Sequence, residues 1–472
     1  MPFIIPANRL STSAVHNIDQ SIRFDSTTNA HMDRTPSSAG NQKTWTFSCW
    51  VKRGKLGSRQ YLFTAFDGNN TNVGMGIFRF QADDTLNWAG YSTNLRRTTQ
   101  VFRDTSAWYH IVLSVDTTNA VGSERQRIYI NGERVTDFAD SSDMAFDTAY
   151  SINGNHAHAI GIGLGNQSSY DFDGYMAEIV LLDGTATDCN SFAEFNSSGI
   201  WIPKDVSGLT FGTNGFHITG ATANDLGADV AGSNNYTTSD LNEHDQMLDS
   251  PTNNFCTLNP RDVGNSPTIT EGNLSQTKGS ASYASSRGTF GFDATDTEGI
   301  YFEVCSVDAT GSYIGILPPE PSDHGASNAT SSADAYIIGT RGSGGGNTWW
   351  TDDGGNINAG NDTSVSKSAG QIIGVAVKNG KVYFSINGVY VLSANPATEA
   401  NPNFSSLTGI YQPYLNAYNT EDVVLNAGQD DTFANNKTSG SAAASDSKGN
   451  GKFYYAPPSG FKALCSKSMG AE

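Results

Sequence analysis

The chain has 472 residues, which is too long for a single hydrophobic core and predicts two or three domains. Its formal net charge of −19 would repel a polyanion, and its basic clusters at 52–55 and 96–97 are short, so nucleic-acid binding is not expected. Charged residues make up 16% of the chain and there are 50 glycines, a composition that indicates β-strands connected by many loops.

Strand-like segments follow one another through the first half of the chain. Residues 45–51 (WTFSCWV) alternate between an apolar and a mixed face, which is the period of a strand. Residues 108–115 predict a second strand, and residues 175–182 a last one. Between them, residues 127–135 predict a hairpin whose Asn131-Gly132 suits a type I′ turn. Short strands separated by turn signals indicate a β-sandwich.

The second half repeats this pattern after a stretch rich in Gly, Asn and Asp. Strand signals resume at 300–304 (IYFEV) and continue through 372–391, where Asn-Gly turns at 379–380 and 387–388 bracket one strand. This spacing predicts a three-stranded antiparallel meander. The expected organisation is an N-terminal arm at 1–21, a first sandwich at 22–202, a connector at 203–260 and a second sandwich at 261–472.

The five cysteines are widely spread and form no C-x-x-C, which favours free, buried thiols in a protein that matures in a reducing cytoplasm. The N-terminus Met1–Pro6 lacks the basic region of a signal peptide. No run approaches the roughly 18 apolar residues of a membrane span. We therefore expect no membrane insertion.

The first block resembles the laminin-G-like, concanavalin-A-type lectin/glucanase fold over roughly residues 22–202. The segments that carry the resemblance are 46–52 (TFSCWVK), 108–112 (WYHIV), 129–132 (YING) and 173–179 (DGYMAEI). The resemblance implies a sandwich of two antiparallel sheets with loops that are free to vary.

The second block is similar to SPRY domains. The matching segments are 301–304 (YFEV), 370–388 and 424–429 (VLNAGQ), although Ala427 stands where an aromatic residue is usual. The two resemblances together imply an all-β chain of two tandem antiparallel β-sandwich (jelly-roll) domains, concanavalin-A-like and then SPRY-like.

The order of the parts resembles that of bacteriophage virion proteins that join a laminin-G-like module to a SPRY-like module. The segments that carry this are 1–8, 200–204 (IWIPK), 212–216 (GTNGF), 248–255 (LDSPTNNF) and 457–464 (PPSGFKAL). Members of this group are usually described as virion structural, tail-fibre or capsid-associated proteins. The resemblance implies a place in the virion, assembly in the host cytoplasm and other virion proteins as partners.

Hydrolysis is tested first because this fold hosts glucanases. Retaining glycosidases need two carboxylates close together, and glucanases of this fold carry them at alternate positions of one strand. The only Glu-x-Asp is Glu243-His244-Asp245, in the expected connector, and Glu178 with Asp183 has the wrong spacing. No G-x-S-x-G or P-loop motif occurs either. We expect no catalytic residues and no enzymatic activity.

Metal ligands are suggested by two features, although no cofactor is required. Laminin-G-like domains often bind calcium at a rim loop, so the resemblance implies Asp67, or Asp171 with Asp173, as calcium ligands. Solvated turn carboxylates are the alternative. His156 and His158 share one strand face and across a three-fold axis could give six nitrogens to one metal, as in some trimeric phage fibres. A merely polar pair is the alternative.

Residues 344–355 (GGGNTWWTDDGG) are the most suggestive local feature for ligand binding. Glycans stack on exposed aromatic faces while neighbouring carboxylates accept hydrogen bonds from their hydroxyls. The predicted contacts with host carbohydrate are Trp349, Trp350, Asp352 and Asp353. The alternative is that strand alternation buries one tryptophan and leaves the other on the rim.

The leading hypothesis is a non-enzymatic phage virion adhesin, a tail fibre or surface fibre that binds host glycans. The alternative is a decoration or joining protein of head or tail that binds only other virion proteins, and a free lectin or glucanase ranks third. Single-site glycan binding is weak, and linking several copies raises avidity by roughly 10²–10⁴. We therefore expect a homo-oligomer, with a trimer favoured.

Overall fold

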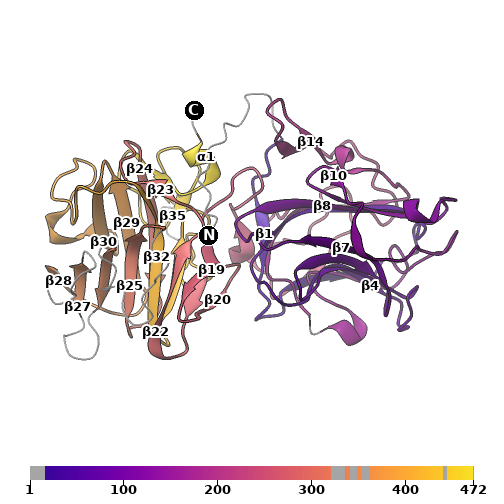
Figure 1. Ribbon diagram of the computed structural model, residues 1–472, viewed down its shortest axis with the longest axis horizontal. Helices are drawn as coiled ribbons and strands as arrows, with labels where there is room; N and C mark the ends of the chain where they lie inside the picture. Colours follow the sequence, from indigo (N-terminus) through magenta and orange to yellow (C-terminus); the bar gives the residue numbers. More distant parts are fainter. Residues whose placement is uncertain are drawn as a thin grey trace. The chain divides into compact units, whose positions relative to one another are not determined.

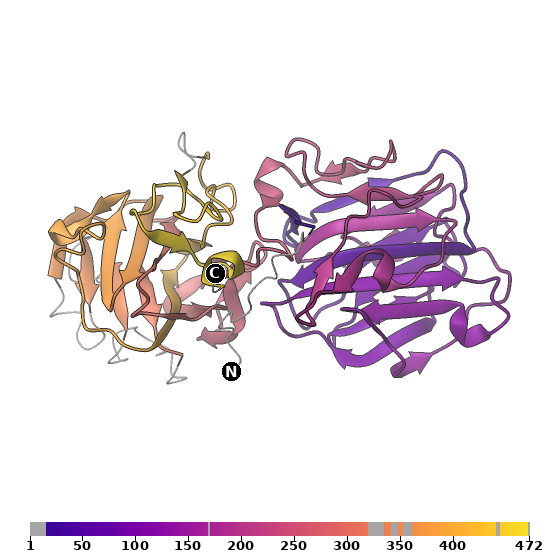
Figure 2. The same ribbon diagram turned by 90° about the horizontal axis from the view of Figure 1, so that it is seen from above.

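The computed structural model describes residues 16–168, 170–319, 335–340, 348–352, 361–439 and 444–470. The chain divides into two units, a first sandwich that ends at Thr252 and a second sandwich that starts at Asn253. Both consist of sheets whose described strands pair antiparallel, apart from one parallel pairing in the second sandwich (Figures 1 and 2), so the all-β fold class is confirmed. The helix α1 (Ser466–Met469) is a single turn, and no helix of the described segments is long and apolar enough to cross a membrane.

The first sheet of the first sandwich has the strand order β10-β9-β8-β3-β13-β1-β18, with β16 paired to β13. Its strands are β10 (Glu133–Arg134), β9 (Gln126–Ile130), β8 (Trp108–Asp116), β3 (Thr44–Arg53), β13 (Gly174–Asp183), β1 (Ser21–Phe24), β18 (Gln246–Met247) and β16 (Phe216–Ile218). Figure 1 shows β8 and β1 of this sheet in one layer, above the layer that contains β7 and β4.

The second sheet of the first sandwich has the order β11-β7-β6-β5-β4-β12-β2-β17. Its strands are β11 (Phe138–Ser141), β7 (Asn94–Val101), β6 (Thr85–Ala89), β5 (Met75–Phe80), β4 (Gln60–Phe66), β12 (Ala157–Ile160), β2 (His31–Arg34) and β17 (Thr237–Ser239). A short hairpin, β14 (Ala193–Phe195) with β15 (Trp201–Pro203), accompanies the first sheet.

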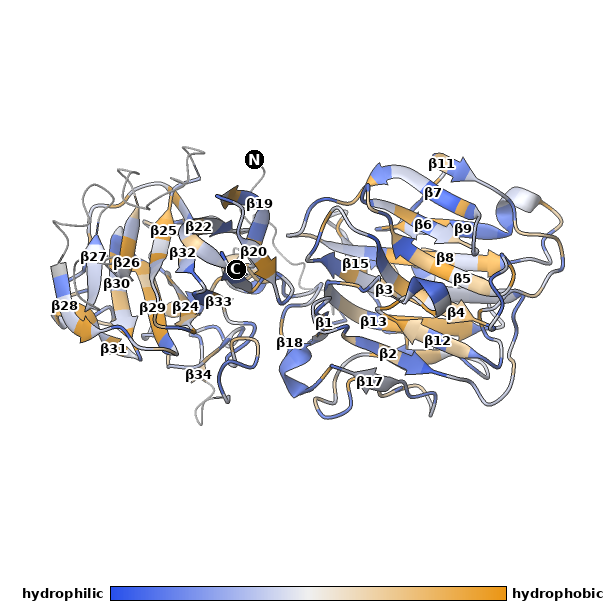
Figure 3. Cartoon of the chain, turned by 90° about the horizontal axis from the view of Figure 1, so that it is seen from below, coloured by the Kyte–Doolittle hydropathy of each residue, from blue (hydrophilic) through white to orange (hydrophobic). Residues whose placement is uncertain are grey.

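The core of the first sandwich lies between its two sheets. The predicted alternation of β3 is confirmed, since Trp45, Phe47, Cys49 and Val51 all lie in this core. Phe47 stacks on Phe63 of the opposite sheet at 4.7 Å between ring centroids. Figure 3 shows apolar residues concentrated on strands such as β12 and β13.

Most of the segment expected as a connector, 203–260, belongs to the first sandwich. Strands β16, β17 and β18 pair with β13, β2 and β1, and Phe216, Ile218 and Met247 are buried. These strands are two or three residues long, so no alternation marks them in the sequence. The first sandwich thus continues about 50 residues beyond the expected end at residue 202.

The second sandwich has one sheet in the order β19-β22-β32-β25-β26-β27-β28, with β23 on β32, and another in the order β20-β21-β33-β24-β29-β30-β31, with β36 on β24. The first of these consists of β19 (Leu258–Gly264), β22 (Ser280–Gly288), β32 (Ile410–Asn419), β25 (Ser312–Leu317), β26 (Tyr336–Thr340), β27 (Thr348–Asp352), β28 (Asn361–Ser366) and β23 (Phe292–Asp293). The other consists of β20 (Thr268–Thr270), β21 (Ser275–Thr277), β33 (Asp422–Asn426), β24 (Gly299–Ser306), β29 (Gln371–Lys378), β30 (Lys381–Ile386), β31 (Val389–Tyr390) and β36 (Phe461–Ala463). A separate pair joins β34 (Ala444–Ser445) to β35 (Lys452–Phe453).

The predicted Asn-Gly turns are confirmed. Both residues have positive φ at 131–132, 379–380 and 387–388, as a type I′ turn requires. The last two turns join β29, β30 and β31 into the expected meander.

Candidate functional site

The two adjacent tryptophans of β27 lie in different environments. Trp349 is 0% exposed, its Nε1 donates to Gln371 Oε1 (2.8 Å), and the Lys367 ammonium lies 4.7 Å from its ring centroid. Trp350 points to the other face and is half-buried, with its Nε1 donating to Thr348 Oγ1 (2.9 Å). The structure therefore corrects the predicted contact at Trp349, because strand alternation places this ring in the core. Asp352 is buried and Asp353 lies outside the described residues.

The candidate calcium ligands Asp67, Asp171 and Asp173 differ in their exposure to solvent. Asp67 is exposed in the β4–β5 loop, where its Oδ1 accepts from the backbone N of Asn69 (2.8 Å). Asp173 is buried and accepts from Ser26 Oγ (3.0 Å), and burial, with the nearby Asp25, raises its pKa to about 6. Burial also raises the pKa of Asp171. In the described part of the chain, no group of three or more His, Cys, Asp and Glu side chains is arranged to hold a metal.

The histidine pair is stacked rather than exposed. The rings of His156 and His158 lie 5.5 Å apart at 9°. His158 is 2% exposed; its Nε2 accepts from the backbone N of Asn153 (3.0 Å), and its Nδ1 faces the carbonyl of His156 (2.8 Å). Burial lowers the pKa of His158 to about 3. Both of its nitrogens are committed within the fold, so it offers none to a shared metal.

A β-bulge in β13 brings an acidic side chain to the outer face of the first sheet. Met176 and Ile179 both point into the core although they are three positions apart instead of two, and the pairing with β3 shifts between Ala177 and Val180. The extra residue is Glu178, whose φ is +50°. Its Oε2 lies 2.6 Å from Nε2 of His217 on β16. Positive φ is strained for a residue with a side chain, and bulges of this kind redirect side chains.

A second histidine, His110 of β8, is held at the outer face by bonds to both ring nitrogens. Its Nδ1 accepts from Trp201 Nε1 (3.1 Å) and its Nε2 lies 2.9 Å from Ser48 Oγ of β3. Burial lowers the pKa of His110 to about 3, so the ring is neutral. Because the indole N–H can only donate, the single ring proton of His110 resides on Nε2 and is donated to Ser48.

The direction of this hydrogen bond determines whether Ser48 can act as a nucleophile. A serine nucleophile requires a histidine nitrogen that accepts the hydroxyl proton. Here Nε2 already carries a proton, and an indole occupies the place of an orienting carboxylate. The serine, histidine and glutamate at this outer face therefore lack the arrangement of a hydrolytic triad.

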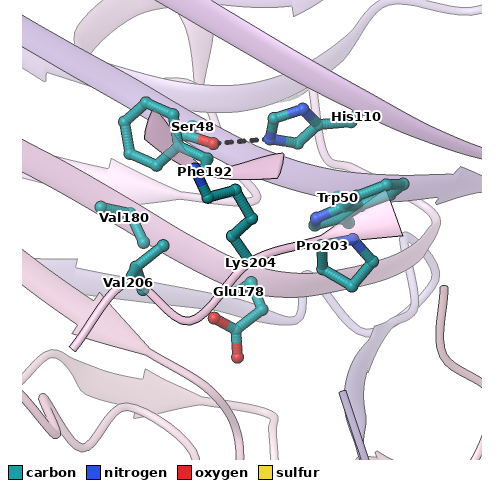
Figure 4. A pocket seen from close by; sticks show the side chains of 9 residues that line it. All are labelled: Ser48, Trp50, His110, Glu178, Val180, Phe192, Pro203, Lys204 and Val206. Carbon is teal, nitrogen blue, oxygen red and sulfur yellow. Dashed lines mark hydrogen bonds between the residues drawn. The ribbon is translucent and has the colours of Figure 1, made fainter. Parts of the chain in front are cut away.

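These residues line a pocket between the outer face of the first sheet and the segment that follows the short helical turn at Cys189–Ser191 (Figure 4). Its cavity volume is about 10 Å³, which is room for about one water molecule. The lining side chains are Ser48, Trp50, His110, Glu178, Val180, Phe192, Pro203, Lys204 and Val206. In Figure 4, Ser48 and His110 lie at the top and Glu178 at the bottom. No sequence motif marks this pocket, because its residues come from distant segments.

Three loops join at the second sheet of the first sandwich. Asn72 Oδ1 accepts from the backbone N of Ser92 (2.8 Å) and of Thr93 (3.1 Å), and Asn166 Nδ2 donates to Tyr91 Oη (3.1 Å). These bonds tie together the loops at 67–74, 90–93 and 161–173. The loops follow β4, β6 and β12.

Aromatic and polar side chains cover these joined loops. The rings of Tyr61 and Tyr170 stack at 5.7 Å and 11°, and the guanidinium of exposed Arg59 lies 5.3 Å from the centroid of Tyr170. Buried Tyr61 donates to Gln167 Oε1 (2.7 Å), whereas Tyr91 is 37% exposed. We name the outward side chains of this set the tyrosine rim. It consists of Arg59, Tyr91, Asn166, Gln167 and Tyr170.

Comparison with known families matches residues 26–189 to the model described as the concanavalin A-like lectin/glucanases superfamily. This region holds the tyrosine rim and the Ser48–His110 pair. A search of curated proteins finds no match to the chain.

Solved structures with a likeness to the chain are distant. A candidate carbohydrate-binding protein from Bacteroides ovatus shares 20% identity at a TM-score of 0.35, covering 48% of this chain and 59% of that one. Domains LG4-5 of the mouse laminin alpha1 chain share 8% identity at 0.32, covering 89% and 91%. A human SPRY domain shares 15% at 0.23, covering 32% and 89%. The chain thus spans about three fifths of the Bacteroides protein, and these TM-scores fix no residue correspondence.

Proposed function

We propose that this chain is a non-enzymatic bacteriophage virion protein, a tail fibre or surface fibre, that binds carbohydrate on the host surface. The tyrosine rim is the observation that carries carbohydrate binding. The exposed ring of Tyr91 offers aromatic surface for the C–H face of a sugar, next to the half-buried Tyr170. Arg59, Asn166 and Gln167 offer donors and acceptors for its hydroxyls. The rim is anchored on paired strands, so little ordering is needed on binding.

The virion setting is supported by the sequence. The order of a lectin-type sandwich, an SPRY-like sandwich and the short segments at 200–204, 248–255 and 457–464 resembles phage virion proteins. The lectin/glucanase family match at 26–189 is in keeping with recognition of a glycan. The Ser48–His110 geometry supports binding without hydrolysis, because the histidine donates to the serine and cannot accept its proton.

The test is binding of the purified full-length protein to host cells and to isolated host polysaccharide. We expect Tyr91→Ala with Tyr170→Ala to reduce binding strongly, because the aromatic surface is lost. Phe146→Ala is the matched control: Phe146 is an exposed aromatic, 58% accessible, that lies outside the rim. Trp350→Ala tests, in the same assay, the contact with carbohydrate that the sequence predicts on the second sandwich. All variants are first checked for an unchanged melting temperature.

Equal binding by the wild type and every variant, or no binding by any of them, would favour the alternative of a decoration or joining protein. Mass spectrometry of purified particles adds an independent measure. A fibre predicts a low copy number in multiples of the proposed trimer, whereas a decoration protein follows the capsid lattice. Light scattering of the purified protein checks the trimer directly.

A further inference from the structure

A buried guanidinium next to the tyrosine rim lacks the acidic partner that other buried arginines have. Five of the described arginines are buried. Four of them form an ion pair with an aspartate: Arg23, Arg53, Arg96 and Arg287. The fifth is Arg79 of β5, which is 8% exposed and has no carboxylate within ion-pair distance among the described residues. Because a buried charge is costly without an opposite charge, this guanidinium is suited to an anion from outside the chain.

A chain of hydrogen bonds leads from Arg79 to the exposed end of the rim. Arg79 Nη1 donates to Oη of Tyr61, its cross-strand neighbour on β4, and Tyr61 donates to Gln167 Oε1 (2.7 Å). Gln167 Nε2 donates to Asn166 Oδ1 (3.2 Å). Asn166 Nδ2 donates to Tyr91 Oη (3.1 Å). A guanidinium can only donate, so each bond in this chain runs outward from Arg79.

This direction leaves hydrogen-bond donors at the surface. Tyr91 Oη accepts from Asn166, and its own proton has no acceptor among the described residues. The exposed guanidinium of Arg59, 5.3 Å from the ring centroid of Tyr170, forms no ion pair with a described residue. Burial lowers the pKa of Arg79, and the nearby positive charge of Arg59 adds to this effect. An anion bound at the rim relieves the repulsion between the two guanidinium groups.

The charge of the whole chain narrows the kind of anion. A net charge of −19 opposes a densely charged polymer such as a heavily sulfated glycan. A planar carboxylate matches the planar fork of a guanidinium. The exposed ring of Tyr91 offers surface for the carbon face of a sugar. A sugar with a single carboxylate meets all of these conditions.

We propose that the tyrosine rim prefers a sugar that carries a carboxylate, such as a uronic acid, over its neutral counterpart. The guanidinium of Arg59 and the hydroxyl of Tyr91 donate to the ligand, and the charge of Arg79 favours its carboxylate. This inference rests on the proposed function, because it names the class of carbohydrate that the same site takes.

The experiment is calorimetric titration of the full-length protein with oligogalacturonate and with its methyl ester, which has the same carbon frame without the charge. We expect the acid to bind roughly tenfold tighter or more, since hydrogen bonds between charged groups are the stronger ones. This ratio should shrink as the salt concentration rises.

Three rim variants and one control locate the preference. Arg59→Gln, Arg79→Gln and Tyr91→Phe should each reduce the ratio of the two affinities, because each removes a charge or a donor. Arg59 and Tyr91 are exposed, so their variants carry the test even if Arg79→Gln does not fold. Arg261→Gln makes the same change of charge at an exposed arginine of the second sandwich and should leave the ratio unchanged.

The other outcomes separate this inference from the proposed function. Equal binding of acid and ester by the wild type, or binding of host polysaccharide but of neither probe, would overturn the inference and leave the proposed function standing. A ratio that is unchanged in the rim variants, or that falls equally in Arg261→Gln, would remove the preference from the rim. Tighter binding of dextran sulfate than of oligogalacturonate would replace the carboxylate by a sulfate. No binding of any carbohydrate would remove the proposed function and this inference together.

Discussion

Trp349 and Trp350 are neighbours in the chain, yet their removal should have unequal effects. Trp349→Ala leaves a large cavity beside the buried Lys367, so we expect a loss of about 3–5 kcal/mol in the free energy of unfolding. Trp350→Ala removes a half-buried ring and should lose less than about 1 kcal/mol. Chemical denaturation measures both. Equal losses would contradict the placement of the two rings on opposite faces of β27.

The strain at Glu178 can be measured with a matched pair of substitutions. Glu178→Ala and Glu178→Gly both remove the contact with His217, but only glycine adopts a φ of +50° without strain. We expect the glycine variant to be more stable than the alanine variant by roughly 1 kcal/mol in urea denaturation. An alanine variant at least as stable as the glycine variant would show that the bulge does not persist.

At the scale of elements, strand β24 of the second sandwich contains a buried acid. Glu303 is 0% exposed and accepts hydrogen bonds from the backbone N of Tyr454 and of Tyr455 (both 2.9 Å) and from Tyr301 Oη (3.1 Å). Burial raises its pKa to about 7, from 4.5. A raised acid pKa means that the folded state binds the proton more tightly. The stabilising contribution of Glu303 is therefore fully present below pH 4.5 and is lost as the pH rises from 4.5 to about 7.

We therefore expect the melting temperature of the second sandwich to fall between pH 4.5 and about pH 7 and to level off above that. In Glu303→Gln this decline should be reduced, whatever the mean stability of the variant, because the titrating group is gone. Scanning calorimetry of the full-length protein at several pH values measures the slope. The same slope in the wild type and the variant would contradict the raised pKa.

Some elements were predictable from sequence and others were not, for identifiable reasons. The alternation of β3 and the Asn-Gly turns are local signals, and both were confirmed. Strands β16 to β18 could not be predicted, because contacts with residues far away in the sequence fix the position of these segments. One such contact is the ion pair between Asp249 and Lys52 (2.7 Å). The pocket could not be predicted for the same reason. The bulge does leave one signal in the sequence, because the apolar residues Met176 and Ile179 are three positions apart instead of two. Which of Trp349 and Trp350 faces the core depends on the register of β27, and the alternation alone does not reveal that register.

At the scale of the whole molecule, the extent of the first sandwich can be tested by truncation. A fragment that ends at Thr252 keeps β16, β17 and β18, whereas one that ends at Ile202 loses them and exposes the core residues they cover. We expect the longer fragment to unfold cooperatively, and the shorter one to melt at a lower temperature or to aggregate. Equal melting of the two would mean that residues 203–252 act as a connector.

Each sandwich begins and ends at neighbouring positions. Ser21 of β1 pairs with Met247 of β18 in the first, and Phe255 bridges to Cys465 in the second. Paired strands are only about 4.8 Å apart, so either sandwich can be spliced into a surface loop of another protein with almost no stretching of that loop. Circular permutants of either one, with the old ends joined by a short linker, need no rearrangement of the sheets. We therefore expect that the DNA segment that encodes either sandwich can be inserted as a unit into the gene of another protein.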